Sequence, residues 1–170
     1  IQEAILRGEL DATIDVVITD KSGAYVVTRA VGFGIPVLEL APKTFDSKAH
    51  YEQAIVDELK KRDIEWVVLA GYMRLVGEVL LGAYENRIVN IHPSLLPSFP
   101  GKDAIGQAFA HGVKVTGVTV HYVDAGMDTG PIIAQHAVDV VEGDLAATEA
   151  RIHEVEHVLY TNTLKQLFGK

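Results

Sequence analysis

The sequence predicts an α/β fold: an open, mostly parallel twisted sheet with flanking helices, an antiparallel strand pair towards the C-terminus and a long C-terminal helix. Short β-branched runs alternate with amphipathic helical segments over the first half of the chain, which is typical of parallel strands joined by crossover helices. Two later strand-like segments follow one another without a helix between them, which is typical of an antiparallel pair. The length of 170 residues is that of a single domain, so we expect one domain over 1–170.

The first segments alternate helix and strand. Residues 1–10 contain an apolar cluster with no capping residue before it, so we expect a helix already under way. Residues 15–19 (DVVIT) form a β-branched run typical of a buried strand. We expect the next helix over 22–32, with Ser22 as its N-cap, and a second short strand over 36–40.

The middle of the chain has the clearest helical periodicity. Tyr51, Ile55 and Leu59 recur every four residues within 47–62, and charged residues fill the exposed positions. The segment EWVVLA at 65–70 is the most apolar strand candidate, so we expect it at the centre of the sheet.

The second half supplies the remaining elements. We expect a short helix over 77–84 and another strand over 88–92. VTGVTVHYV at 115–123 and PIIAQHAVDV at 131–140 are the two strands of the antiparallel pair. A final helix, over about 145–167, closes the chain.

Composition excludes several classes of protein. The net charge of -8 argues against a general affinity for nucleic acid, which requires a basic surface. Cysteine is absent, so neither a disulfide framework nor a thiolate metal site is expected, and a reducing, cytoplasmic compartment fits. No segment reaches the ~18 consecutive apolar residues of a membrane span, and no signal peptide is visible.

The segment IVNIHPSLLPSFPG, residues 88–101, is the clearest candidate site. Residues two apart on a strand point to the same side, so we expect Asn90 and His92 to face one space at the carboxyl end of the strand. Ligands bind at that edge in open α/β sheets. Three prolines stiffen the chain after His92, which suits a positioned catalytic group. A histidine at a strand end is more often a structural residue, so these residues alone indicate a functional site of unknown chemistry.

The segment DAGMDTGP, residues 124–131, connects the last two predicted strands. A turn that uses Asp and Gly for their tolerance of positive φ explains Asp124, Gly126 and Gly130. It explains Asp128 less well, because Asp128 precedes Gly-Pro in a loop longer than a hairpin needs.

The last predicted helix contains HEVEH, with His153 and His157 four residues apart and Glu154 after the first histidine. This resembles the HExxH pattern of zinc proteases. The pattern is short enough to arise by chance in a helix rich in His and Glu, and no third ligand is indicated nearby. We therefore expect no metal, and zinc is a minor alternative.

Five segments together resemble the glycinamide ribonucleotide formyltransferase family. The two blocks that carry most of the resemblance are IVNIHPSLLPSFPG and TGVTVHYVDAGMDTGPII; the others are FDSKAHYE, VVLAGYMRL and EVEHVLY. HPSLLP followed by FPG is similar to the purine enzyme rather than to methionyl-tRNA formyltransferase or formyltetrahydrofolate hydrolase, which carry extra domains. The resemblance implies a formyltransferase-like fold.

The resemblance also implies a reaction, in which a formyl group passes from 10-formyltetrahydrofolate to the amine of glycinamide ribonucleotide without a metal. Asn90 would donate a hydrogen bond to the oxyanion of the tetrahedral intermediate, and a protonated His92 would donate another. Asp128 would favour the protonated form of His92 and help to move a proton from the amine to the folate nitrogen.

Ligand-binding residues follow from the same resemblance. The folate would be bound by Lys48, Met73, Arg74, Leu75, Val76, Asn90, Asp124, Ala125, Gly126 and Met127, and the nucleotide by Gly71 and Glu156. Lys48 stands where the family often has Arg, so the charge is kept and the bidentate fork is lost. Arg74 has an alternative interpretation as an ordinary surface residue.

The family opens with a strand and a Gly/Ser/Asn-rich loop that holds the substrate phosphate at a helix N-terminus. Residues 1–10 resemble the helix after that loop, so we expect the strand and the loop to be lacking. Two alternatives stay open. The same three residues could serve hydrolysis of 10-formyltetrahydrofolate with water in place of the amine, and the missing loop is compatible with a non-catalytic folate-binding fragment. The sequence is compatible with a monomer or a homodimer.

Overall fold

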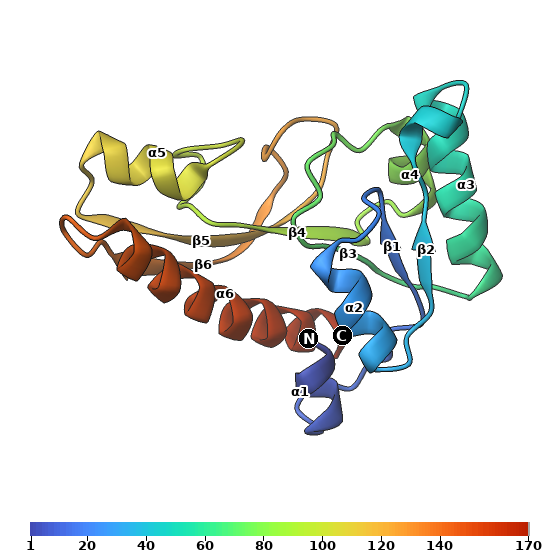
Figure 1. Ribbon diagram of the computed structural model, residues 1–170, viewed down its shortest axis with the longest axis horizontal. Coiled ribbons are helices and arrows are strands. Elements are labelled where there is room, and N and C mark those ends of the chain that lie inside the picture. The colour runs from blue at the N-terminus through green and yellow to red at the C-terminus, as the bar shows by residue number, and fades with distance from the viewer. Residues whose placement is uncertain (170) are drawn as a thin grey trace.

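The computed structural model describes residues 1–169, and Figure 1 shows its helices arranged around two groups of strands. In chain order the elements are α1 (Gln2–Leu6), β1 (Val17–Thr19), α2 (Tyr25–Gly32), β2 (Val37–Glu39), the 3-10 helix η1 (Pro42–Thr44), α3 (Lys48–Lys61), β3 (Val67–Leu69), α4 (Glu78–Ala83), β4 (Ile88–His92), α5 (Ala104–His111), β5 (Val115–Tyr122), β6 (Ile132–Asp139) and α6 (Leu145–Phe168).

The strands form two sheets. β1 and β2 pair in parallel as a two-stranded sheet. The larger sheet has the order β3–β4–β5–β6, in which β3 and β4 are parallel and the other neighbours are antiparallel. The predicted α/β class is therefore confirmed, with parallel strands first, an antiparallel pair towards the C-terminus and the long helix α6 at the end.

The strand predicted at 65–70 is β3, and its predicted central position is wrong, because β3 lies at an edge of the four-stranded sheet in the described part of the chain. Its apolar character has another cause. Val67 and Leu69 pack against the core cluster of α3 and α4, whereas Trp66 and Val68 pack against the cluster that contains α6. An apolar run shows that both faces of a strand are covered, and it does not show where the strand lies across the sheet.

The observed helices differ from the predicted ones in two places. α2 begins at Tyr25 rather than at Ser22, because Gly23 has a φ of 74° and interrupts the helical backbone. α5 was not predicted, although both of its ends carry the usual signals. The Asp103 side chain caps its N-terminus, and Gly112 ends it with a φ of 85°.

α6 covers one face of the four-stranded sheet (Figure 1). Val89 of β4 and Val120 of β5 are both 0% exposed and pack in one cluster with Tyr160 and Leu164 of α6. Because side chains alternate along a strand, Asn90 projects from the opposite face. The polar residues at the end of β4 therefore lie on the face that α6 leaves open.

Candidate active site

The register between β4 and β5 brings four polar side chains onto one face of the sheet. Asn90 lies opposite His121, and His92 lies opposite Thr119. Residues two apart on each strand share a face, and directly opposed residues have their Cβ atoms close together. The candidate site is therefore built on two adjacent strands of the sheet, β4 and β5.

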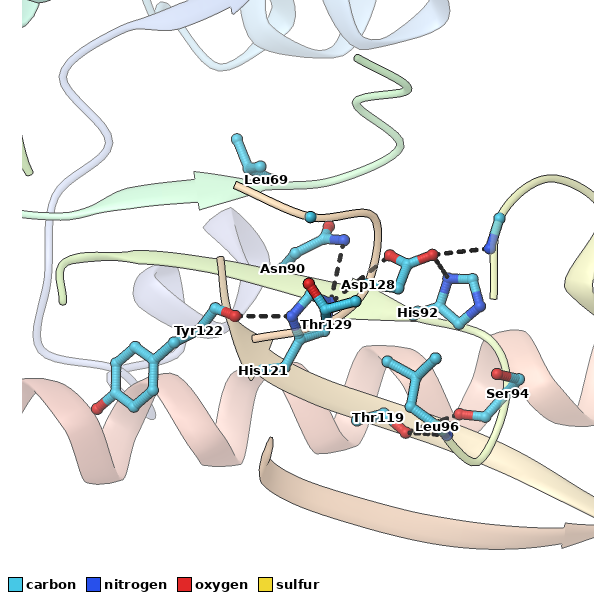
Figure 2. A network of polar contacts seen from close by, with 12 residues as sticks. Leu69, Asn90, His92, Ser94, Leu96, Thr119, His121, Tyr122, Asp128 and Thr129 are labelled. Carbon is cyan, nitrogen blue, oxygen red and sulfur yellow. Dashed lines mark hydrogen bonds and ion pairs between the residues drawn. The ribbon is translucent and has the colours of Figure 1, made fainter. Parts of the chain in front are cut away.

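Asp128 joins this group from the loop between β5 and β6 (Figure 2). Its Oδ2 atom accepts a hydrogen bond from the Gly101 backbone N–H at 2.8 Å and lies 3.5 Å from His92 Nδ1. Its Oδ1 atom lies 3.8 Å from His121 Nε2. The Asp128 side chain is 7% exposed and its φ is 57°, a left-handed conformation that Asp tolerates better than most residues. Structure thus brings together the three residues proposed for catalysis.

His92 has a hydrogen-bond acceptor at one ring nitrogen and a carboxylate near the other. Nε2 lies 2.9 Å from the Phe99 carbonyl oxygen, which can only accept, so Nε2 carries a proton. Nδ1 faces the Asp128 carboxylate. In the neutral ring Nδ1 would point a lone pair at an anion, so this geometry favours the doubly protonated, cationic form of His92.

His121 is a residue of the site that the sequence did not identify as one. Its Nδ1 atom lies 2.8 Å from the Tyr122 carbonyl oxygen, and its Nε2 atom lies 3.5 Å from Asn90 Nδ2. In the sequence His121 is one of seven histidines, and it lies in a strand-like segment. Only the register that places it opposite Asn90 distinguishes it from the others.

Thr119 anchors the proline-rich loop, residues 93–101, which follows β4. Its hydroxyl donates to the Ser94 carbonyl oxygen at 2.7 Å and accepts from the Leu96 N–H at 3.1 Å and from Gln135 Nε2 at 3.0 Å. Ser94 and Thr119 are both 0% exposed. A fully satisfied buried network of this kind holds a loop rigidly, and this loop carries the Phe99 carbonyl group that contacts His92.

A cavity of about 490 Å³ lies between the start of α3 and the segment after β3. Its lining includes Lys48, Met73, Arg74 and Leu75, together with Pro42, Ser47, Tyr51, Glu52 and Tyr72. Four of the predicted folate contacts therefore share one hollow. The segment that contributes Tyr72 to Leu75 follows β3, which ends at Leu69, and Leu69 is the register partner of Asn90 on β4.

Two contacts hold the segment after β3. Arg74 Nε lies 2.9 Å from Asp20 Oδ2, so its guanidinium forms an ion pair with the end of the β1 region. Glu52 is 2% exposed and accepts hydrogen bonds from the N–H groups of Gly77 at 2.7 Å and Leu80 at 3.2 Å. A Cβ at Gly77 would lie 2.8 Å from Glu52 Oε1, so a side chain there would displace this carboxylate.

Val76, another predicted folate contact, is 3% exposed and packs in the core, so only its backbone can contact a ligand. Gly71 has a φ of 69° and open space around its Cα, so the turn itself requires glycine there.

The loop at 124–127 is partly explained as a turn. Asp124 Oδ1 accepts hydrogen bonds from the Gly126 N–H at 3.0 Å and from the Thr129 hydroxyl at 2.6 Å. Ala125, Gly126 and Met127 are exposed. This leaves a short, accessible stretch of backbone directly before Asp128.

Glu156 lies on α6, whose packing places it on the other side of the sheet from Asn90. Its Oε2 atom is 3.2 Å from His153 Nδ1. The HEVEH alternative gains nothing from this arrangement, because residues 1–169 contain no group of three or more His, Asp or Glu side chains placed to hold a metal ion.

Tyr160 ties α6 to the end of the sheet where the site lies. Its hydroxyl donates to the Leu69 carbonyl oxygen at 2.6 Å and lies 3.3 Å from that of Val89. Complete burial raises the pKa of the Tyr160 hydroxyl far above its usual range, so it stays protonated and remains a donor.

None of the helices in the described chain is both long and apolar enough to span a membrane.

Comparison with known proteins gives a consistent result. Residues 1–164 match the family model described as Formyl transferase. The chain is 54% identical over 160 residues to the phosphoribosylglycinamide formyltransferase of Bacillus subtilis (strain 168), covering 94% of this chain and 82% of the relative. It is 39% identical to part of the human trifunctional purine biosynthetic protein adenosine-3, covering 91% of this chain and 15% of that protein.

Solved structures are similar throughout. Phosphoribosylglycinamide formyltransferase from Bacillus halodurans superposes with a TM-score of 0.95 at 57% identity, covering 99% of this chain and 87% of that one. Glycinamide ribonucleotide transformylase 1 from Geobacillus kaustophilus gives a TM-score of 0.93 at 56% identity, covering 97% of this chain and 88% of that one.

Proposed function

The chain belongs to the formyl transferase family, and from this premise we propose that it transfers a formyl group from 10-formyltetrahydrofolate to the amine of glycinamide ribonucleotide, a step of de novo purine biosynthesis. The observation that carries the proposal is the buried group of Asn90, His92 and Asp128, in which an amide and a cationic imidazole lie beside one carboxylate. The names of the most similar relatives support formyl transfer to this nucleotide and give no support to a hydrolase or a non-catalytic module.

The residues suit acyl transfer to an amine. The amine nitrogen attacks the formyl carbon, a C–N bond forms, and the carbonyl oxygen becomes an oxyanion. Asn90 donates an amide hydrogen bond to this oxygen and His92 donates a second, charged one; one such donor is typically worth about 10²–10³ in rate.

The intermediate then collapses with cleavage of the bond between the formyl carbon and the folate nitrogen. The proton lost by the amine passes to that nitrogen, directly or through water, with Asp128 and His92 as the groups able to accept and donate it. The amine loses one proton and the folate nitrogen gains one, so His92 and Asp128 end the reaction in the protonation states in which they began it.

Residues around the cavity supply the folate contacts in this proposal. Lys48, Met73 and Leu75 line the cavity with exposed atoms. Arg74 is engaged by Asp20, and the Val76 side chain is buried, so both contribute through their backbone. The exposed stretch from Ala125 to Met127, which follows Asp124, borders the same ligand. Gly71 contacts the nucleotide, and Glu156, which lies on α6 across the sheet from Asn90, would contact only a part of the nucleotide remote from its reacting amine.

The proposal also covers the setting of the reaction. Both ligands are diffusible small molecules, and the chemistry above uses no metal, nucleic acid or membrane. The absence of cysteine suits a reducing compartment, so we place the enzyme in the cytoplasm, as either a monomer or a homodimer.

The test is a turnover assay on the purified full-length protein with 10-formyltetrahydrofolate and glycinamide ribonucleotide. We expect the formylated nucleotide as product and a loss of about 10²–10³ in kcat for His92→Ala. Formate released at a comparable rate without the nucleotide would favour the hydrolase. Folate binding without turnover of either kind would favour the non-catalytic module.

A further inference from the structure

Two histidines of the site have nearly the same surroundings. One ring nitrogen of each lies against a backbone carbonyl oxygen: His92 Nε2 at 2.9 Å from Phe99, and His121 Nδ1 at 2.8 Å from Tyr122. The other ring nitrogen of each faces Asp128, at 3.5 Å for His92 and 3.8 Å for His121. Figure 2 shows Asp128 lying between the two rings.

One carboxylate can compensate only one imidazolium. The side chains of His92, His121 and Asp128 are 7%, 3% and 7% exposed, so a second cation would be buried without a counter-charge, which is strongly unfavourable. One of the two histidines is therefore neutral.

Asn90 decides which histidine is neutral. Its Nδ2 atom lies 3.5 Å from His121 Nε2. An amide N–H requires an acceptor, and His121 Nε2 accepts only in the neutral ring that carries its proton on Nδ1. The Tyr122 carbonyl oxygen selects that tautomer, because it can only accept the Nδ1 proton. A Cβ at Gly130 would overlap this carbonyl oxygen, so the loop packs directly against it.

The same contact orients the amide of Asn90. With Nδ2 turned to His121, the Oδ1 atom is left buried and without a hydrogen-bond partner in the described chain. Buried polar atoms are nearly always paired, so an unpaired one in a site indicates a donor supplied by a ligand. The second hydrogen of Nδ2 remains available as well.

We propose that His121 is a positioning residue, held neutral with its proton on Nδ1, which fixes the amide of Asn90 so that Oδ1 accepts an N–H of the attacking amine while Nδ2 donates to the formyl oxygen. Asn90 then holds nucleophile and electrophile together, in addition to stabilising the oxyanion. This inference rests on the proposed formyl transfer for the identity of the amine, whereas the state of His121 is a property of the protein alone.

The first test is the protonation of the two rings in the unmodified protein. Long-range ¹H–¹⁵N correlation spectra of ¹⁵N-histidine-labelled protein near neutral pH distinguish the Nδ1–H tautomer, the Nε2–H tautomer and the imidazolium. We expect Nδ1–H for His121 and imidazolium for His92, with assignments from His121→Phe and His92→Gln. His121 found as Nε2–H or as a cation would overturn the proposal, even if formyl transfer is confirmed.

The second test is kinetic. His121→Phe keeps a flat ring but offers no acceptor, so we expect kcat to fall by about 10-fold to 100-fold through misplacement of the Asn90 amide, with KM for both ligands unchanged. His121→Gln can present an amide oxygen to Asn90 and should recover most of this loss. In an Asn90→Ala background His121→Phe should have no further effect, because it acts through Asn90.

Additive losses in that double variant, or a rise in KM with kcat preserved, would contradict the positioning role. Thermal unfolding of each variant separates a folding defect from a kinetic one. Absence of formyl transfer in the unmodified protein would refute the proposed function, while the spectra would still decide the state of His121.

Discussion

The proposed site has two parts, which we call the catalytic wall and the ligand wall, and they are held in different ways. The catalytic wall, formed by Asn90, His92, His121 and Asp128, is largely buried and rests on β4 and β5, with backbone groups fixing both imidazole rings. The ligand wall, formed by the start of α3 and the segment 72–77, has exposed side chains and is held by the Arg74–Asp20 pair and by Glu52.

The difference separates two tasks. Groups that stabilise a transition state act best when they are already in place, since no reorganisation is needed during the reaction. Groups that bind a large ligand can adjust as it enters. Changes in the catalytic wall should therefore lower kcat, and changes in the ligand wall should raise KM.

The largest effect is expected for Asp128→Asn, which removes the anion beside His92 and keeps the side-chain shape. The cationic form of His92 loses its counter-charge, so we expect kcat to fall by about 10²–10⁴ with little change in KM. Steady-state kinetics would measure this. Asp63→Asn is the matched control, because Asp63 is exposed and also has a left-handed backbone with a φ of 52°; it should leave kcat unchanged, and a loss for Asp128→Asn no larger than for Asp63→Asn would contradict the role of Asp128.

Thr119→Val tests the anchor of the proline-rich loop. Loss of the hydroxyl leaves the Leu96 N–H and the Ser94 carbonyl oxygen without this partner, so we expect a loss of about 1–3 kcal/mol in the free energy of unfolding and a lower kcat. Thr116→Val on the same strand is the control, because the Thr116 hydroxyl is buried without a partner and its removal should be neutral or stabilising. Urea unfolding would compare the two, and equal effects would show that the network has no role.

Glu52→Gln tests the ligand wall. Glu52 accepts two backbone hydrogen bonds at the start of α4, and the amide can accept only through its one oxygen. We expect a loss of about 1–3 kcal/mol in unfolding free energy and a higher KM for the folate at nearly unchanged kcat. Glu58→Gln on the same helix is the control, because Glu58 is partly exposed and its ion pairs are screened by water, so its replacement should change stability much less than Glu52→Gln does. A fall in kcat with KM unchanged would contradict the division between the walls.

The smallest effect is expected for Arg74→Ala. The Arg74 side chain is 49% exposed, and an exposed ion pair such as the one with Asp20 contributes little to stability because water screens it. We expect a slight rise in the KM for the folate and no change in kcat. Asp20→Asn should produce the same change, and a double-variant cycle would show whether the two residues act as a pair.

Features that depend on neighbouring residues were predictable. The strand at 88–92 was predicted with the bounds that β4 has, because an apolar run ends there at Asn-x-His and a proline. α3 begins one residue after Ser47, whose hydroxyl accepts from the His50 N–H at 3.1 Å, as an N-cap does. Periodicity also places Asn90 and His92 on one side of a strand, and motif resemblance added Asp128 and the ligand-binding residues.

Features that depend on distant residues were not predictable. α5 is an exception, a local feature that was missed because its 8 residues span only about two turns, although its caps were present in the sequence. The edge position of β3 was missed because apolar content depends on the helices above and below a strand. His121 and Thr119 enter the site only through the register of β5 against β4.

The sequence by itself therefore determined the fold class, the main segments and the three residues proposed for catalysis, because capping, periodicity and motifs depend on residues within a few positions of one another. Tertiary structure decided which histidine shares Asp128 with His92, which hydroxyl anchors the proline-rich loop and which contacts hold the ligand wall. The residues that meet in the site are far apart in the sequence. Gly101 and Asp128 are separated by 27 residues, Asn90 and His121 by 31, and Asp20 and Arg74 by 54. Only the closing of the sheet and its loops brings such residues within hydrogen-bonding distance.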